Sequence, residues 1–364
     1  MITPQMLKEL ESCTGTNEIP ADFDAFWADR MAEADAVQLD YKVVPSDVPA
    51  YPTCEYLDLW FRGMGGARLY ARYLKPVSAG PVPLVLRFHG YPGRTRSWWE
   101  NSSFAGLGFA DITMDNPGQG GRSQDVGGFC GPTVSGHLIT GLEGDPKGMY
   151  YVRLHQDIRI LCRIVRQLPG LDTSLVCVYG DSQGGGVGLA TCALNPDLVT
   201  RAGILYPFLS DYREVWELGQ DQIAYEGLRY YSRWFDADGS RADQKFRQLG
   251  YVDTLGFAHM VRCPVLFGSG LSDDVCPLPT QFAVYNALGT QHKRHLLYPD
   301  FGHEEIQAFD DELINFFWKG GERSWRVSLT PCVSSPPTGA CEKSPKASTP
   351  SGSPVPSTRR RPAR

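Results

Sequence analysis

In Leu175-Val-Cys-Val-Tyr-Gly180-Asp-Ser182-Gln-Gly184-Gly-Gly, an apolar strand runs into a tight turn and then into a small-residue helix, and this order points to the fold. Gly180-x-Ser182-x-Gly184 is the pattern of a nucleophile elbow, a sharp strand-to-helix turn that carries a serine. The neighbouring helix N-terminus favours developing negative charge. A nucleotide-binding turn is the alternative, but the G-x-G-x-x-G spacing is missing and the motif comes late in the chain. The stretch therefore predicts a nucleophile at Ser182.

Short apolar runs alternate with helical patterns on both sides of this motif. Such alternation indicates a mostly parallel sheet with helices on both faces. Together with the elbow, it predicts the α/β-hydrolase fold. Strands are expected at 83–88, at the end of 104–115, and at 174–180, 201–207, 263–270 and 293–299, with helices at 155–168, 184–194, 278–288 and 304–318.

Three regions lie outside this alternation. Aromatic residues within 20–27 are spaced i, i+3, i+4 and predict an amphipathic helix. The stretches 54–61 and 67–74, joined by a glycine-rich link, predict a hairpin. Residues 211–258 are rich in Tyr, Trp, Arg and Asp, and we expect them to form a small helical cap insertion.

The composition separates a folded domain, expected over residues 1–323, from a tail at 324–364. The tail is rich in Pro, Ser and Thr, and residues 331–364 carry six basic residues against one acidic residue. Such a segment buries too little apolar surface to offset its ordering entropy, so we expect disorder. We interpret its terminal RRRPAR as a solvated end. A basic targeting signal and a nucleic-acid contact are the less favoured alternatives.

Charge and hydropathy exclude several classes of protein. A net charge of −6 argues against nucleic acid as the partner. No apolar run reaches the roughly 18 residues that span a membrane, and the N-terminus does not read as a secretory signal, so a cytoplasmic protein is expected. The ten cysteines form no C-x-x-C pair, which predicts free thiols in a reducing compartment and no metal or cofactor.

A serine nucleophile requires a base and an orienting acid, which follow it in the chain order Ser, Asp, His in this fold. His303 comes after the last apolar run and fits the position of the base, at the start of a helix. Asp273 and Asp274 follow the run 263–270, and either could be the acid. Spacing alone does not choose between them.

The oxyanion hole requires two backbone N–H groups aimed at the ester carbonyl. Gln183 follows the nucleophile and predicts one donor. The loop after the strand 83–88 contains His89-Gly90-Tyr91, which predicts a second donor at Tyr91. His89 is expected to brace this loop and to take no direct part in catalysis.

These residues resemble the acetyl xylan esterase/cephalosporin C deacetylase family, carbohydrate esterase family seven, over roughly residues 1–320. The G-x-S-Q-G motif of that family matches residues 180–184, and its H-E motif matches His303-Glu304. Its R-G-Q motif corresponds to 117–119, where Gln119 is retained. The resemblance implies supporting roles for Gln119 and Glu304, beside those of His89, Gly90, Gly180 and Gly184.

The resemblance also implies which acid acts. The family aspartate stands three residues before the cysteine of a C-P pair, and here Cys276 precedes Pro277, which gives Asp273. It implies a metal-free esterase that removes acetyl groups from short acetylated xylo-oligosaccharides and from cephalosporin C. Members of the family are intracellular and form hexamers, so a homo-oligomer is expected.

One position departs from the family pattern. Pro117 stands where the family has arginine, so a guanidinium with five donors is replaced by a residue with no N–H. Arg94 and Arg122 are the candidate substitutes. Other readings remain: an esterase of non-sugar substrates, a peptidase on the same fold, or a non-catalytic binding protein.

Overall fold

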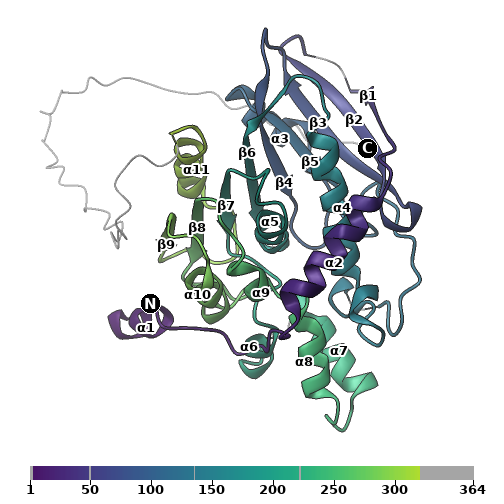
Figure 1. Cartoon of the computed structure of the whole chain (residues 1–364). Helices are drawn as coiled ribbons and strands as arrows, with labels where there is room; N and C mark the ends of the chain where they lie inside the picture. The colour runs from purple at the N-terminus through teal and green to yellow at the C-terminus, as the bar shows by residue number, and fades with distance from the viewer. Residues whose placement is uncertain (1–2, 49–50, 135, 221–222, 320–364) are drawn as a thin grey trace, which may run out of the picture. The chain divides into compact units, whose positions relative to one another are not determined.

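The structure is a computed structural model that describes residues 3–48, 51–134, 136–220 and 223–319 (Figure 1). The predicted tail at 324–364 lies outside the described residues, as do Cys332 and Cys341. In this part of the chain no helix is both long enough and apolar enough to cross a bilayer. All eight cysteines within it are free thiols, as predicted.

The described residues form a nine-stranded sheet with the order β1-β2-β3-β5-β4-β6-β7-β8-β9. The first three strands pair antiparallel, β3 pairs antiparallel with β5, and all pairs from β5 to β9 are parallel. The strands are β1 (Tyr41–Pro45), β2 (Cys54–Arg62), β3 (Arg68–Pro76), β4 (Val82–Phe88), β5 (Ala110–Met114), β6 (Leu171–Asp181), β7 (Arg201–Leu205), β8 (Val265–Gly270) and β9 (Lys293–Tyr298).

Helices join these strands and cover both faces of the sheet (Figure 1). They are α1 (Pro4–Leu10), α2 (Phe23–Ala36), α3 (Trp98–Gly106), α4 (Tyr150–Val165), α5 (Gln183–Leu194), α6 (Tyr212–Glu217), α7 (Glu226–Phe235), α8 (Ala242–Gly250), α9 (Thr254–Ala258), α10 (Leu278–Ala287) and α11 (Gln307–Lys319). The predicted α/β-hydrolase fold is confirmed.

Alternation along the central strands explains the two layers of helices. Val176 and Val178 of β6 belong to one buried cluster, whereas Cys177 and Tyr179 belong to a second. Because successive side chains of a strand point to opposite faces, both faces of β6 are apolar and both must be covered. Helices α2, α4, α5 and α9 contribute to the first cluster, and α3 and α11 contribute to the second.

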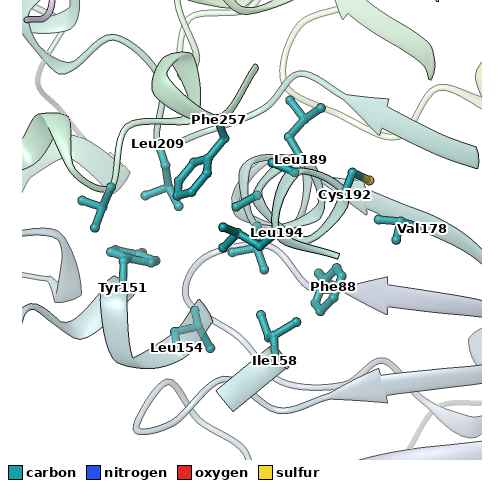
Figure 2. Close-up of a cluster of buried hydrophobic side chains, with 14 of the residues drawn as sticks. Phe88, Tyr151, Leu154, Ile158, Val178, Leu189, Cys192, Leu194, Leu209 and Phe257 are labelled. Atoms are coloured by element: carbon teal, nitrogen blue, oxygen red, sulfur yellow. The ribbon is translucent and has the colours of Figure 1, made fainter. Parts of the chain in front are cut away.

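Figure 2 shows the first cluster around α5, the helix that follows the predicted nucleophile. Leu189 and Cys192 of α5 lie among Phe88 and Val178 from the sheet and Ile158 of α4. Every residue of α5 is buried, which fits its small-residue sequence. The start of this helix is therefore held firmly by the core.

The chain between β7 and β8 contains the helices α6 to α9, joined by turns and irregular segments. Helices α7 and α8 are joined by a hydrogen bond from Lys245 Nζ to Ser232 Oγ (2.7 Å). Gln248 of α8 donates to the Gly144 carbonyl (2.8 Å), which ties this region to the loop before α4. The domain boundaries at 211–258 stay a prediction.

Several elements differ from those predicted. The sequence reading missed α1, β1 and α3, and α4 begins at Tyr150 instead of residue 155. His303 does not open a helix, because α11 begins at Gln307. The turn around His303 is held by hydrogen bonds from the Ser272 N–H to the Phe301 carbonyl and from the Gly302 N–H to Glu304 Oε1.

Candidate active site

The strand-to-helix turn at Ser182 has the geometry that its glycines require. A Cβ at Gly180 would lie 2.0 Å from the Gly184 carbonyl oxygen, and a Cβ at Gly184 would lie 2.0 Å from the Phe88 carbonyl oxygen. Neither position accepts a side chain. Ser182 itself has φ 55° and ψ −122°, a rarely populated conformation for a residue with a Cβ. Its N–H donates to the Leu205 carbonyl (3.1 Å), which helps to hold that conformation.

The structure brings Ser182, His303 and Asp273 together at the carboxyl ends of the parallel strands. His303 Nδ1 lies 3.0 Å from Asp273 Oδ2, and His303 Nε2 lies 2.9 Å from Ser182 Oγ. Since an ionised carboxylate only accepts, the proton belongs on Nδ1, and Nε2 is free to accept from the serine hydroxyl. The three groups form a continuous hydrogen-bonded relay.

Asp273 is fixed by more than the histidine. Its Oδ1 accepts the Val275 and Cys276 N–H groups at 2.9 and 2.8 Å. Its Oδ2 also accepts from Gln281 Nε2 at 3.1 Å. Asp274 is exposed and makes no such contact among the described residues. Of the two candidates, only Asp273 is aimed at His303.

The loop after β4 passes beside the serine. A Cβ at Gly90 would lie 4.0 Å from the Ser182 Cβ, so the backbone that carries Tyr91 comes close to the nucleophile. This loop, Ser182 and His303 line an open pocket of about 320 Å³, which we call the catalytic pocket. Tyr91 is one of the residues that line this pocket, and its role as an oxyanion donor stays a prediction.

His89 braces this loop, as the sequence reading preferred. Its Nε2 accepts the Asn116 N–H at 3.0 Å, so the ring proton stands on Nδ1 and is donated to the Gly90 carbonyl at 2.8 Å. Burial lowers the pKa of His89 below its usual value and keeps the ring neutral. The histidine therefore joins the loop after β4 to the loop after β5.

Gln119 holds Gln183 through a reciprocal pair of amides. Gln119 Nε2 donates to Gln183 Oε1, and Gln183 Nε2 donates to Gln119 Oε1, both at 2.8 Å. Tyr151 donates to the same Gln183 Oε1 at 2.8 Å, and Gln183 is fully buried. Tyr151 was not singled out from the sequence, and no motif marks it.

The turn at Pro117 and the two candidate substitutes, Arg94 and Arg122, make separate contacts. The Pro117 carbonyl accepts from the Tyr150 hydroxyl at 2.7 Å, which anchors the turn without an arginine. Arg122 pairs with Asp58 (3.2 Å) and lies over the Tyr70 ring. Arg94 lines the catalytic pocket and makes no ion pair with the described residues.

Glu304 and Tyr206 support the position of His303. The Tyr206 hydroxyl donates to the Glu304 carbonyl at 2.7 Å, and the Tyr206 ring lies 4.5 Å from the His303 ring, centroid to centroid. The Glu304 side chain accepts the Gly302 N–H. Glu304 therefore acts through its backbone and the turn it closes, and it is not aimed at Ser182.

The sequence reading also missed an ion pair directly beside Ser182, the predicted nucleophile. Arg96 Nη2 lies 3.1 Å from Asp181 Oδ1, and Arg96 also pairs with Glu100 and Glu305. Asp181 is the residue between Gly180 and Ser182 in the elbow motif, which is the one signal that could have singled it out.

One group of side chains in the described residues has the composition of a metal site. Ligand atoms of Asp273, Cys276 and His303 lie within 4.8 Å of one another. Two of the three already bond each other in the relay, and burial raises the pKa of the Cys276 thiol well above its usual value. A protonated thiol is a poor ligand, so this group fits the hydrogen-bonded relay better than a metal centre.

Comparisons with known proteins identify the family of this chain. The model of the acetyl xylan esterase (AXE1) family matches residues 1–320. Acetyl esterase Axe7A of Xylanibacter ruminicola is 29% identical over 291 residues, which cover 77% of this chain and 62% of that protein. The chain thus spans less than two thirds of the length of that curated relative.

Solved structures give the same family. Acetyl xylan esterase 1 from Thermoanaerobacterium sp. JW/SL YS485 has 39% identity and a TM-score of 0.83, over 87% of this chain and 98% of that one. Acetyl xylan esterase from Paenibacillus sp. R4 has 27% identity and a TM-score of 0.81, over 85% and 98%. Pyrococcus horikoshii acylaminoacyl peptidase, at 18% identity and a TM-score of 0.53, shares the fold alone, over 74% of this chain and 42% of its own. The chain belongs to the acetyl xylan esterase family and is a serine ester hydrolase.

Proposed function

We propose that this enzyme removes acetyl groups from small acetylated sugars, such as xylo-oligosaccharides, by way of an acetyl-enzyme formed on Ser182. The observation that carries the proposal is the relay from Asp273 through His303 to Ser182, with bonds of 3.0 and 2.9 Å, inside the catalytic pocket. The choice of an acetyl group and of a sugar in this proposal is taken from the names of the relatives, acetyl esterase and acetyl xylan esterase.

In the first step, His303 Nε2 takes the Ser182 proton while Oγ attacks the ester carbonyl. Asp273 holds the imidazole in the productive tautomer and stabilises the imidazolium that forms. Because Asp273 is fixed by two backbone N–H groups and by Gln281, it keeps this orientation as charge develops.

The negative charge on the carbonyl oxygen is stabilised by the backbone N–H groups of Tyr91 and Gln183. His89 and Gln119 keep these two donors in place through the hydrogen bonds described above. As the bond between the carbonyl carbon and the sugar oxygen breaks, His303 gives its proton to that oxygen, and the sugar leaves as a free alcohol. A water molecule activated by the same histidine releases acetate and restores Ser182.

The open catalytic pocket suits a polar alcohol that remains partly in water. Its charged lining groups are Arg94, Arg96, Asp181 and His303 when protonated, so the sugar meets hydrogen-bonding groups on several sides. Cephalosporin C, which also carries an acetyl ester, is a second substrate implied by the family resemblance.

The test is acetate release from acetylated xylo-oligosaccharides and from cephalosporin C by wild type and Ser182→Ala. We expect kcat to fall by about 10⁴-fold or more in the variant, as in other serine triads. Retention of most activity by Ser182→Ala would refute the assignment of Ser182 as the nucleophile. A wild type that cleaves simple aryl acetates but no acetylated sugar would refute the substrate class.

We also propose that the enzyme acts as a homo-oligomer, as the family resemblance implies. Light scattering coupled to size-exclusion chromatography measures the mass in solution. A hexamer would have six times the 40.3 kDa mass of the chain, and a monomeric mass at micromolar concentration would contradict the proposal.

A further inference from the structure

A second cavity lies behind the catalytic pocket. It has a volume of about 350 Å³ and is bounded by residues of α3 and α11 and by side chains of β4, β6 and β7, so we call it the α3–α11 cavity. The catalytic pocket and the α3–α11 cavity share two lining residues, Arg96 and Asp181. The ion pair between these side chains therefore stands on the boundary between the two spaces.

We call the Arg96–Asp181 ion pair the partition, and further contacts hold it in place. Arg96 contacts Asp181 at 3.1 Å, Glu100 at 3.3 Å and Glu305 at 3.2 Å. Glu100 is itself fixed by a capping box with Ser97 at the start of α3. Because Asp181 directly precedes Ser182, the partition lies one residue from the proposed nucleophile.

The chemistry of the α3–α11 cavity differs from that of the catalytic pocket. Apolar side chains supply much of its wall: Phe104, Leu107, Leu205, Ile306, Leu313 and Ile314. The guanidinium of Arg87, which also lines it, is already engaged by Asp111 and by the Glu100 carbonyl. The wall also carries polar groups, among them Ser103, Tyr206 and Asp310, and its apolar part suits a hydrocarbon chain.

We propose that the Arg96–Asp181 ion pair sets the acyl-length limit of this esterase, by closing an apolar cavity that would otherwise accept a longer aliphatic acyl chain. The inference rests on the proposed function, in which the acyl group is bound to Ser182. A chain longer than acetyl must pass two charged groups to reach the cavity, and it would have to strip them of their partners. The partition thus selects for acetyl esters.

The experiment compares kcat/KM for p-nitrophenyl acetate, butyrate and hexanoate in wild type, Arg96→Ala and Asp181→Ala. Each methylene that enters an apolar site is worth about fourfold in binding. The butyrate-to-acetate ratio should therefore rise by roughly tenfold in both variants. Arg94→Ala is the matched control, because it removes a guanidinium from the catalytic pocket but leaves the partition intact, and its ratio should equal that of wild type.

A double variant tests whether the gain arises in the cavity itself. Ser103 is exposed and lines the α3–α11 cavity, so Ser103→Trp can fill the space from its rim. Added to Arg96→Ala, this change should return the butyrate-to-acetate ratio toward the wild-type value. A ratio that stays high would show that the chain is bound elsewhere, and would overturn the assignment.

Two further outcomes would overturn the partition. One is a wild type that hydrolyses hexanoate as fast as acetate, and the other is an unchanged ratio in variants that still hydrolyse acetate. If an alanine variant does not fold, Arg96→Gln and Asp181→Asn decide by the same ratio, since both weaken the ion pair and conserve shape. Failure of the proposed function has a different signature: the Ser182→Ala variant still hydrolyses acetate esters.

Discussion

The groups that react and the groups that support them are built in different ways. Ser182, Asp273 and His303 each follow one strand, so the local backbone brings them to the same edge of the sheet. The supporting contacts join residues far apart in the chain: Gln119 with Gln183, and His89 with Asn116. The comparison teaches that local backbone rules specify the chemistry, whereas its precision depends on long-range contacts that no local rule contains.

The largest effect should come from changing a reacting group while keeping its shape. Asp273→Asn would donate from its amide toward His303 and favour the wrong tautomer, so kcat should fall by about 10⁴-fold. The neighbouring Asp274→Asn is the matched control and should change kcat by less than about twofold, because Asp274 touches no group of the relay. Steady-state kinetics on p-nitrophenyl acetate measures both. Equal losses in the two variants would contradict the assignment of the acid.

A change in a supporting group should lower kcat by a smaller factor. Gln119→Ala removes both amide bonds to Gln183, and a small shift of the oxyanion donor should lower kcat by about 10- to 100-fold with KM nearly unchanged. Gln124→Ala, an exposed glutamine five residues further on, is the control. A rise in KM at constant kcat would show instead that Gln119 binds substrate. Recovery of kcat in Gln119→Glu, which keeps one acceptor, would support the positioning role.

The smallest expected effect is on stability and not on activity. Burial lowers the pKa of His155, which packs between Trp27 and Phe257, to about 3. Its folded pKa lies below its unfolded pKa of about 6.5, so the unfolded chain gains a proton that the folded chain resists, and stability falls as pH drops below about 6.5. The loss from this residue should be about 2 kcal/mol at pH 5.

Urea unfolding of wild type and His155→Leu at pH 7.5 and pH 5 measures this contribution. The variant should lose less free energy of unfolding between the two pH values than wild type does. Parallel losses in the two proteins would mean that His155 does not cause the acid sensitivity.

The fold could be predicted from the sequence because its central strands are short apolar runs separated by helical patterns. The missed elements lack that signal: β1 is partly exposed at the sheet edge, and α3 begins with aromatic residues within a turn-rich stretch. His303 was placed correctly after β9, yet its helix begins four residues later. A helical periodicity locates a helix but does not fix the residue at which it begins.

The sequence predicted the site less completely than the fold. Ser182 and His303 were identified from motif and order alone, but the choice of Asp273 over Asp274 required the family resemblance. Tyr151 and the Arg96–Asp181 pair could not be predicted, since each is defined by a contact between separate parts of the chain. Their residue types are ordinary, and only the packing gives them a role.

The backbone of Ser182 has a consequence for the tolerance of this protein to change. At φ 55° and ψ −122°, this position suits glycine better than any residue with a side chain. The hydroxyl that we propose as the nucleophile therefore belongs to a residue whose backbone conformation favours glycine. An inactive Ser182→Gly protein should therefore resist heat better than wild type. Selection for thermostability alone would favour the loss of Ser182.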